Sequence, residues 1–268
     1  MEQSQDELSA LLPNIANQMR GLLSNLHLAA TQAIPPKARE QDPALDARAS
    51  VLDQSFYRLL RLVNSLSAAE YLTEAHPLSL RDTDLVKLVG TVCETSGDLA
   101  EQLGIHLKFV CAMDRRVCAV SPTAVEQLLY HLLSNALKFT AAGGNVTVEL
   151  KKRGEQLLLS VADTGCGIPP ERLEHLFDSC LLPQTAAPRH GLGLGLPICR
   201  AIAERHGGRI AVESVLKQGT RFIVSLPDRQ LGTQVSDVPP LYDSGFNHPL
   251  LGLADALPAE AYTVRNQD

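Results

Sequence analysis

The sequence predicts an α+β fold in which an antiparallel helical hairpin precedes an α/β sandwich. Two observations carry this prediction. Apolar residues recur at steps of three and four through the first quarter of the chain, which is the period of long, packed helices. Further along, helical segments alternate with short apolar strands, as in a mixed sheet whose helices cover one face.

The first helix is expected over about residues 6–33, and the proline pair that follows residue 34 ends it. Its apolar stripe consists of Leu8, Leu12, Ile15, Met19, Leu22 and Leu26. A polar loop then leads into the second helix, expected over about residues 45–72, whose stripe consists of Leu52, Phe56, Leu59, Val63 and Leu66.

A lone hairpin leaves both stripes in water. We therefore expect it to pair with a second copy into a dimeric four-helix bundle. The alternative is that the hairpin docks onto the rest of the chain.

The sandwich follows as a run of shorter elements. Helices are expected over residues 84–103, 121–139 and 196–206. Strands are expected over residues 105–111, 116–120, 145–150, 156–163, 209–213 and 220–226. After residue 227 the periodicity is lost and prolines collect among acids and amides, which is typical of a flexible segment. The alternative for residues 249–253 is a short docking motif.

These elements divide the chain into three expected domains. The helical hairpin takes residues 1–76, the α/β sandwich takes residues 77–227, and a flexible tail takes residues 228–268.

Composition excludes several function classes. The 268 residues carry a net charge of -6 and contain no basic run, so no nucleic-acid partner is expected. The acidic N-terminus lacks the pattern of a secretory signal, and no apolar run approaches a membrane span. The six cysteines form no zinc-ligand pattern. We therefore expect a cytoplasmic protein without membrane insertion.

Three motifs carry chemistry. In the helix over residues 121–139, the side chains of His131, Asn135 and Lys138 share one face. Asp163 ends an apolar strand and is followed by Gly165 and Gly167, which permit a sharp turn beside its carboxylate.

The third motif is a glycine-rich loop before the helix over residues 196–206. Its alternate glycines, Gly191, Gly193 and Gly195, would let backbone amides approach a phosphate. The spacing matches neither the dinucleotide-binding fingerprint nor the P-loop.

In this order the motifs resemble the N box and the two glycine boxes of the ATP-binding domain of sensor histidine kinases, a superfamily that includes gyrase and Hsp90. Leu176 and Phe177 resemble the phenylalanine box of that family. The hairpin resembles its dimerisation and phosphoacceptor domain, so the resemblance covers about residues 6–227.

The resemblance implies that ATP and Mg²⁺ are the cofactors. Asn135 would hold the magnesium ion, Lys138 would neutralise phosphate charge, and Asp163 would read the adenine amine. The glycines would shape the adenine pocket (Gly165, Gly167) and let the lid close (Gly191, Gly193, Gly195). In the lid, which lies between Phe177 and Gly191, Arg189 is our candidate for a contact with a phosphate. His131 stands where the family usually has asparagine.

The stretch from Asn14 to Leu23 resembles the H box of the same family, S-H-E-L-R-T-P-L. In that alignment Asn17 stands at the phosphorylated histidine and Gln18 at the adjacent base. An amide nitrogen has its lone pair delocalised, so Asn17 cannot attack a phosphate, and a carboxamide cannot take up a proton. His27 lies ten residues further along and is a poor substitute acceptor.

We therefore expect a histidine kinase-like protein of two-component signalling that binds Mg-ATP, with impaired autophosphorylation. Its expected partners are a second copy, a response regulator and a separate sensor subunit. One alternative is a non-catalytic ATP-dependent signalling scaffold, and another is a kinase that phosphorylates a partner in trans. A serine kinase of the anti-sigma type or a gyrase-like ATPase is disfavoured by the hairpin and by the lack of a glutamate base in the N box.

Overall fold

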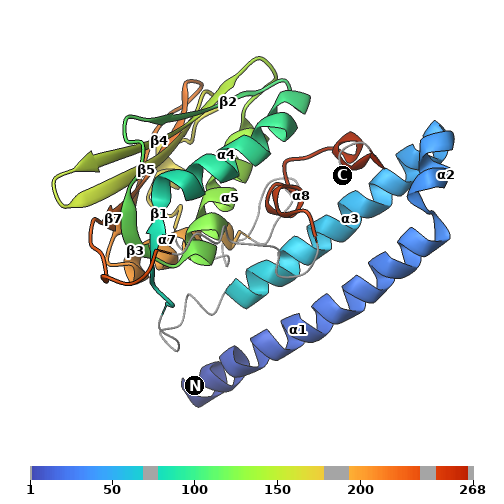
Figure 1. Ribbon diagram of the computed structural model, residues 1–268, viewed down its shortest axis with the longest axis horizontal. Coiled ribbons are helices and arrows are strands. Elements are labelled where there is room, and N and C mark those ends of the chain that lie inside the picture. Colours follow the sequence, from blue (N-terminus) through green and yellow to red (C-terminus); the bar gives the residue numbers. More distant parts are fainter. Residues whose placement is uncertain (1, 69–77, 178–192, 236–245, 265–268) are drawn as a thin grey trace.

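The computed structural model describes residues 2–68, 78–177, 193–235 and 246–264, with the side chains of the first helix described from residue 14. The predicted α+β class is confirmed. Two long antiparallel helices, α1 (Glu2–Ala33) and α3 (Pro43–Ala68), lie beside a sheet that is covered by shorter helices (Figure 1).

A short helix, α2 (Pro36–Gln41), lies between α1 and α3, where we expected only a loop. Proline at its first position suits a helix start, because the missing amide would be unpaired there in any case. The guanidinium of Arg39 is buried and donates to Asp46 at 2.8 Å and Asp53 at 2.7 Å. These bonds anchor the turn of the hairpin to α3.

The two apolar stripes of the hairpin differ in exposure. On α1 every described member of the predicted stripe is exposed: Ile15, Met19, Leu22 and Leu26. On α3, Phe56 and Val63 are buried, whereas Leu52 and Leu59 are exposed. Thus the stripe of α3 is partly docked onto the rest of the chain, and the described part of the α1 stripe is not. Across the described residues, no helix combines the length and apolar character needed to cross a bilayer.

Within the described residues, the main sheet has five strands in the order β2-β4-β5-β7-β6, and only β2 and β4 are parallel neighbours there. Their bounds are β2 (His106–Cys111), β4 (Asn145–Arg153), β5 (Gln156–Asp163), β6 (Arg209–Val215) and β7 (Gly219–Pro227). A separate two-stranded sheet pairs β1 (Arg81–Asp84) with β3 (Val117–Val120).

Strand β1 escaped prediction because it is short and charged. Its Asp82 is nevertheless buried. The burial is tolerated because the carboxylate accepts hydrogen bonds from the backbone amides of Leu231 and Thr233, both at 2.8 Å. Those bonds are long-range and leave no local signature in the sequence.

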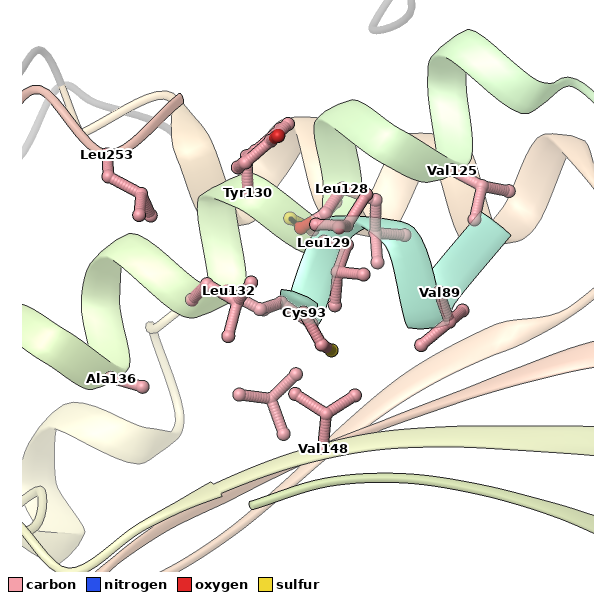
Figure 2. Close-up of a cluster of buried hydrophobic side chains, with 14 of the residues drawn as sticks. Val89, Cys93, Val125, Leu128, Leu129, Tyr130, Leu132, Ala136, Val148 and Leu253 are labelled. Carbon is pink, nitrogen blue, oxygen red and sulfur yellow. Dashed lines mark hydrogen bonds between the residues drawn. The ribbon is translucent and has the colours of Figure 1, made fainter. Parts of the chain in front are cut away.

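Three helices lie on one face of the main sheet: α4 (Leu85–Gln102), α5 (Pro122–Phe139) and α7 (Gly195–Arg205) (Figure 1). A single turn, α6 (Pro170–Leu173), follows the sheet strand β5. Figure 2 shows Val89 and Cys93 of α4 and Leu132 of α5 above Val148 of β4, with Tyr130 on the opposite side of α5. Helix α5 is therefore apolar on both sides, and both sides are covered.

The last described residues correct the prediction of a flexible tail over residues 228–268. Residues 246–264, here named the C-terminal segment, contain α8 (His248–Gly252) and a 3-10 helix, η2 (Ala259–Tyr262). The segment buries Leu250, Leu253, Leu257 and Tyr262. This apolar burial against α3 and α5 offsets the entropy of ordering the backbone, in spite of the prolines.

Polar contacts join the C-terminal segment to the hairpin at several points. Gln54 Nε2 donates to the carbonyl of Leu257 at 2.8 Å, and Arg39 Nη2 donates to the carbonyl of Tyr262 at 2.9 Å. On its other side, Gly252 lies so close to the ring of Tyr130 on α5 that a Cβ would overlap it. The segment thus holds α3 and α5 together.

We predict that Tyr262→Ala lowers the free energy of unfolding by about 3 kcal/mol or more, as for other large aromatic side chains deleted from a core. The side chain is fully buried, and its ring lies 5.3 Å from that of Tyr57 on α3. Chemical denaturation followed by circular dichroism measures the change.

The control is Leu231→Ala, since Leu231 is half exposed in the same C-terminal third of the chain and its loss should cost under about 1 kcal/mol. Equal stabilities for the two variants would contradict the packing of the C-terminal segment.

Candidate nucleotide site

Residues His131, Asn135 and Lys138 all lie on α5, spaced by four and three residues. Asn135 and Lys138 are half-buried, whereas His131 is 8% exposed. The ammonium of Lys138 lies 5.7 Å from the centroid of the Phe139 ring at the end of the helix. Because α5 is fixed by packing on both sides, these polar groups are held on a rigid element.

His131 lies against the start of α7. A Cβ at Gly195 would come within 3.1 Å of its Nδ1 atom, so the absence of a side chain at Gly195 lets α7 begin close to α5. Burial lowers the pKa of His131 to about 3, and the nearby charge of Arg61 lowers it further. The imidazole is therefore neutral at physiological pH.

Asp163 ends β5, as predicted, and is half-buried. Its Oδ1 atom accepts the backbone amides of Gly165 at 2.8 Å and Thr220 at 3.2 Å. Both bonds engage Oδ1, which leaves Oδ2 to accept a hydrogen bond from a ligand. Burial raises the pKa of Asp163 above its ordinary value, and the two amides offset part of that rise.

The glycines after Asp163 are required by close backbone contacts. A Cβ at Gly165 would overlap the carbonyl oxygen of Phe139, and one at Gly167, whose φ is +68°, would overlap that of Val215. The amide of Cys166 donates to the Phe139 carbonyl at 3.2 Å. The turn after β5 and the end of α5 are thereby brought together.

The glycine-rich loop is described only in part. Gly193, with a φ of +71°, and Gly195 precede and begin α7. Arg189 and Gly191 lie outside the described residues.

A family model matches the part of the chain that contains this site. Residues 120–230 match the family described as histidine kinase-, DNA gyrase B-, and HSP90-like ATPase. The similarity extends beyond that domain: the chain is 32% identical over 219 residues to sensor protein SrrB of Staphylococcus aureus strain NCTC 8325. This alignment takes in 81% of the chain.

The chain has a sensor histidine kinase core. Among solved structures, the full-length ShkA complex with AMPPNP superposes with a TM-score of 0.66 at 25% identity, over 84% of this chain and 47% of that one. The catalytic domain of histidine kinase ThkA, in a nucleotide-free form, superposes with a TM-score of 0.51 at 26% identity, over 57% of this chain and 99% of that one. The kinase core spans only 37% of the length of SrrB.

The kinase core presents Asn17 and Gln18 on the exposed side of α1. The carboxamide oxygen of Asn17 accepts from Arg20 Nη1 at 2.8 Å, and Nη2 of the same guanidinium donates to Asn64 on α3 at 3.0 Å. These bonds tie Asn17 to the hairpin. Among the described residues, no contact joins Asn17 or Gln18 to Asp163.

His27 has a packing environment in the kinase core. Its ring stacks on Phe56 with centroids 4.1 Å apart, and its Nδ1 atom lies 3.8 Å from Asp53. Burial lowers its pKa, and although the Asp53 charge acts in the opposite direction it does not cancel that effect. The stacking covers one face of the ring, as expected for a histidine between packed helices.

Sequence reasoning missed two residues that hold the site. Thr220 supplies a backbone amide to Asp163, a role that carries no side-chain signature. Arg20 orders Asn17 and connects α1 to α3. The sequence signal for Arg20 was a polar side chain beside an apolar stripe. Every solvated helix face shows that pattern, so it did not single out Arg20.

We predict that Asp163→Asn raises the melting temperature of the nucleotide-free protein at pH 7. Asparagine keeps the Oδ1 acceptor for Gly165 and Thr220 but removes the charge whose burial raises the carboxyl pKa. A raised folded-state pKa means that the wild type regains stability as pH falls through that value. The advantage of the variant should therefore shrink between pH 7 and about pH 4, as thermal unfolding at constant ionic strength can measure.

The control is Asp228→Asn, which should behave with the opposite sign. Burial acts to raise the pKa of Asp228, but hydrogen bonds from Arg116 and Lys152 lower it on balance. Loss of this carboxylate should lower the free energy of unfolding at pH 7. That difference in stability should fade as the pH falls through the ordinary pKa of an aspartate toward the lower folded-state pKa. Parallel pH profiles for the two variants would contradict the environment described for Asp163.

Proposed function

We propose that this chain binds Mg-ATP and serves two-component signalling as a histidine kinase-like protein whose own acceptor position cannot be phosphorylated. One observation carries the proposal: the groups expected to bind the nucleotide are assembled around α5, while the acceptor position on α1 holds an amide.

Asp163 is suited to read an adenine amine. Its Oδ1 accepts hydrogen bonds from two backbone amides. This fixes the direction of Oδ2, a further acceptor at the C-terminal end of β5. The glycines that follow let the backbone turn closely beside it. The nucleotide analogue named with ShkA, to which 84% of this chain superposes, supports the same assignment.

Asn135 fits a magnesium ion through its amide oxygen, since magnesium prefers oxygen ligands and keeps waters and substrate phosphates in its shell. Within the described ranges, no group of three or more His, Cys, Asp or Glu residues suits a metal ion. The ion would therefore take its other ligands from phosphates and water. When bound, it would neutralise phosphate charge, and Lys138 would share that task.

Autophosphorylation would require a nucleophile at residue 17. A neutral imidazole attacks the γ-phosphorus, so that a nitrogen–phosphorus bond forms as the bond to ADP breaks, whereas an amide nitrogen lacks the available lone pair. Asn17 instead accepts a hydrogen bond from Arg20. Gln18 cannot act as the base in place of a carboxylate.

We predict that incubation with γ-labelled Mg-ATP leaves the wild-type chain unlabelled, whereas Asn17→His with Gln18→Glu acquires acid-labile, alkali-stable label. The matched control is Asn14→His, since Asn14 is also exposed on α1. Adding Asp163→Asn to the double variant should abolish both labelling and nucleotide binding. The amide NH₂ of asparagine would face the adenine amine, and both groups are hydrogen-bond donors. Label on the wild-type chain would contradict the proposal.

Mixing the wild type with a triple variant distinguishes the two alternatives, a kinase that acts in trans and a non-catalytic scaffold. If the wild type phosphorylates in trans, it should label the triple variant Asn17→His, Gln18→Glu, Asp163→Asn, which has an acceptor but reads no adenine. If the chain is a non-catalytic scaffold, the wild type should bind the nucleotide without labelling either its own chain or the triple variant.

We further propose a homodimer through the hairpin, with a response regulator as its signalling partner. The apolar stripe of α1 repeats at steps of four and three, and its members Leu22 and Leu26 are 70% and 62% exposed. Such a stripe on a long helix is typical of a bundle interface. Similarity to a sensor protein supports the response regulator.

We predict that Leu22→Glu with Leu26→Glu converts a dimer into a monomer in sedimentation velocity, because each carboxylate would be desolvated at the interface. Leu28→Glu is the control, since Leu28 is 57% exposed but lies off the stripe. A wild type that is monomeric at micromolar concentration would refute the dimer, and so would a double variant that stays dimeric.

A further inference from the structure

The C-terminal segment lies between the hairpin and the sandwich and contacts both (Figure 1). Three side chains of the hairpin donate hydrogen bonds to backbone carbonyls of the segment, at 2.8 to 3.2 Å: Arg39, Gln54 and Arg58. A fourth, Arg61, forms an ion pair with Asp255 of the segment at 3.1 Å. Together with the buried ring of Tyr262, these bonds attach the segment to the hairpin.

On the sandwich side the segment makes a smaller contact, through α8. Gly252 lies against the ring of Tyr130 on α5, and His248 Nδ1 lies 3.2 Å from Oε1 of Glu126 on the same helix. The segment packs more extensively on α3 than on α4 or α5. Its attachment is therefore unequal, with the stronger side on the hairpin.

A cavity of about 470 Å³ lies beside α8. The hairpin contributes Arg20 and Asn64 to its lining, α5 contributes Gln127 and His131, and α8 contributes Gly252. At this level the hairpin and α5 therefore face open space instead of packing on each other, and α8 is the packed connection between them. Two parts of a chain that share a small, partly polar contact are free to move relative to each other when that contact opens.

We propose that the C-terminal segment is an intramolecular clamp. It stays attached to the hairpin, and its α8 holds the sandwich in one position by its contact with α5. When that contact opens, the sandwich moves as a rigid unit relative to the hairpin. The clamp is inferred from these contacts alone, and only its consequence for phosphoryl transfer rests on the proposed function.

The clamp would control which groups of the hairpin the nucleotide site can approach. Asn135 and Asp163 belong to the sandwich, whereas Asn17 is on α1. While α8 is docked on α5, the separation between these groups is fixed. Opening the clamp makes the separation variable, and transfer of a phosphoryl group depends on the exact placement of the reacting atoms. The docked segment is thus a restraint on any transfer between the sandwich and the hairpin.

Single-molecule Förster resonance energy transfer on the nucleotide-free full chain tests the clamp. The two dyes are attached through noncanonical amino acids at the positions of Asn25, on α1, and Glu155, at the turn between β4 and β5, which are both exposed. The labelled chain is diluted into excess unlabelled chain, so that transfer between two copies does not contribute. We expect one narrow population for the wild type.

Gly252→Leu should replace that population by a second, broader one. A side chain at residue 252 overlaps the ring of Tyr130, so α8 must leave α5. The matched control is Gly97→Leu, since Gly97 is also in a helix, α4, but a Cβ added there meets no atom within 4 Å. Adding Tyr130→Ala to Gly252→Leu makes room for the leucine and should restore the narrow population. A combined variant that stays broad would contradict α8 and α5 as the point of release.

A second release variant leaves the core unchanged. Gln54→Ala with Arg58→Ala removes two hydrogen bonds that half-buried side chains of α3 donate to the segment, and it should also broaden the population. Its control is Arg48→Ala, exposed on the same helix.

Circular dichroism identifies the variants that are folded. A narrow population like that of the wild type in either folded release variant would overturn the proposal, and so would a broad population in the wild type itself. Because no nucleotide is present, the result does not depend on whether the chain binds ATP or acquires label.

Discussion

The burial of α5 on both of its sides is the constraint on which the rest of the structure depends. One side packs against the sheet, where Leu132 lies above Val148, and the other is covered by the C-terminal segment, where Gly252 lies on Tyr130. A helix with apolar residues on two opposite sides is stable only where both sides are covered. The polar residues of α5 therefore occupy fixed positions, and His131 can lie against Gly195 without a hydrogen-bond partner for Nε2.

Local patterns were sufficient to predict the helices and strands that are long and periodic, and the order of the motifs was sufficient for the turn at Asp163. Local patterns were not sufficient where long-range contacts determine whether a segment forms a strand or a helix. The residues of β1 are charged and form a strand because Asp82 binds distant amides. The C-terminal segment is rich in proline, and its apolar residues acquire a structure only because α3 and α5 offer them a surface. The ion pair between Arg61 and Asp255 joins residues far apart in the sequence, so it left no local signature.

A polar network centred on Arg20 joins the two long helices. Its guanidinium donates to the carboxamide oxygen of Asn17 on α1 and to that of Asn64 on α3. The side chain of Asn17, which we propose to stand at the acceptor position, is thereby held by the hairpin itself.

The contact between Arg39 and Tyr262 has a consequence for synthesis of the chain. These residues are 223 positions apart, so α2 and α3 cannot finish packing until the C-terminal segment has been made. At the usual rates of translation, α3 would wait about 10 to 45 s for the segment that covers Tyr57 and Leu60. During that interval its apolar face would be open to other surfaces, including the α3 of a neighbouring nascent chain.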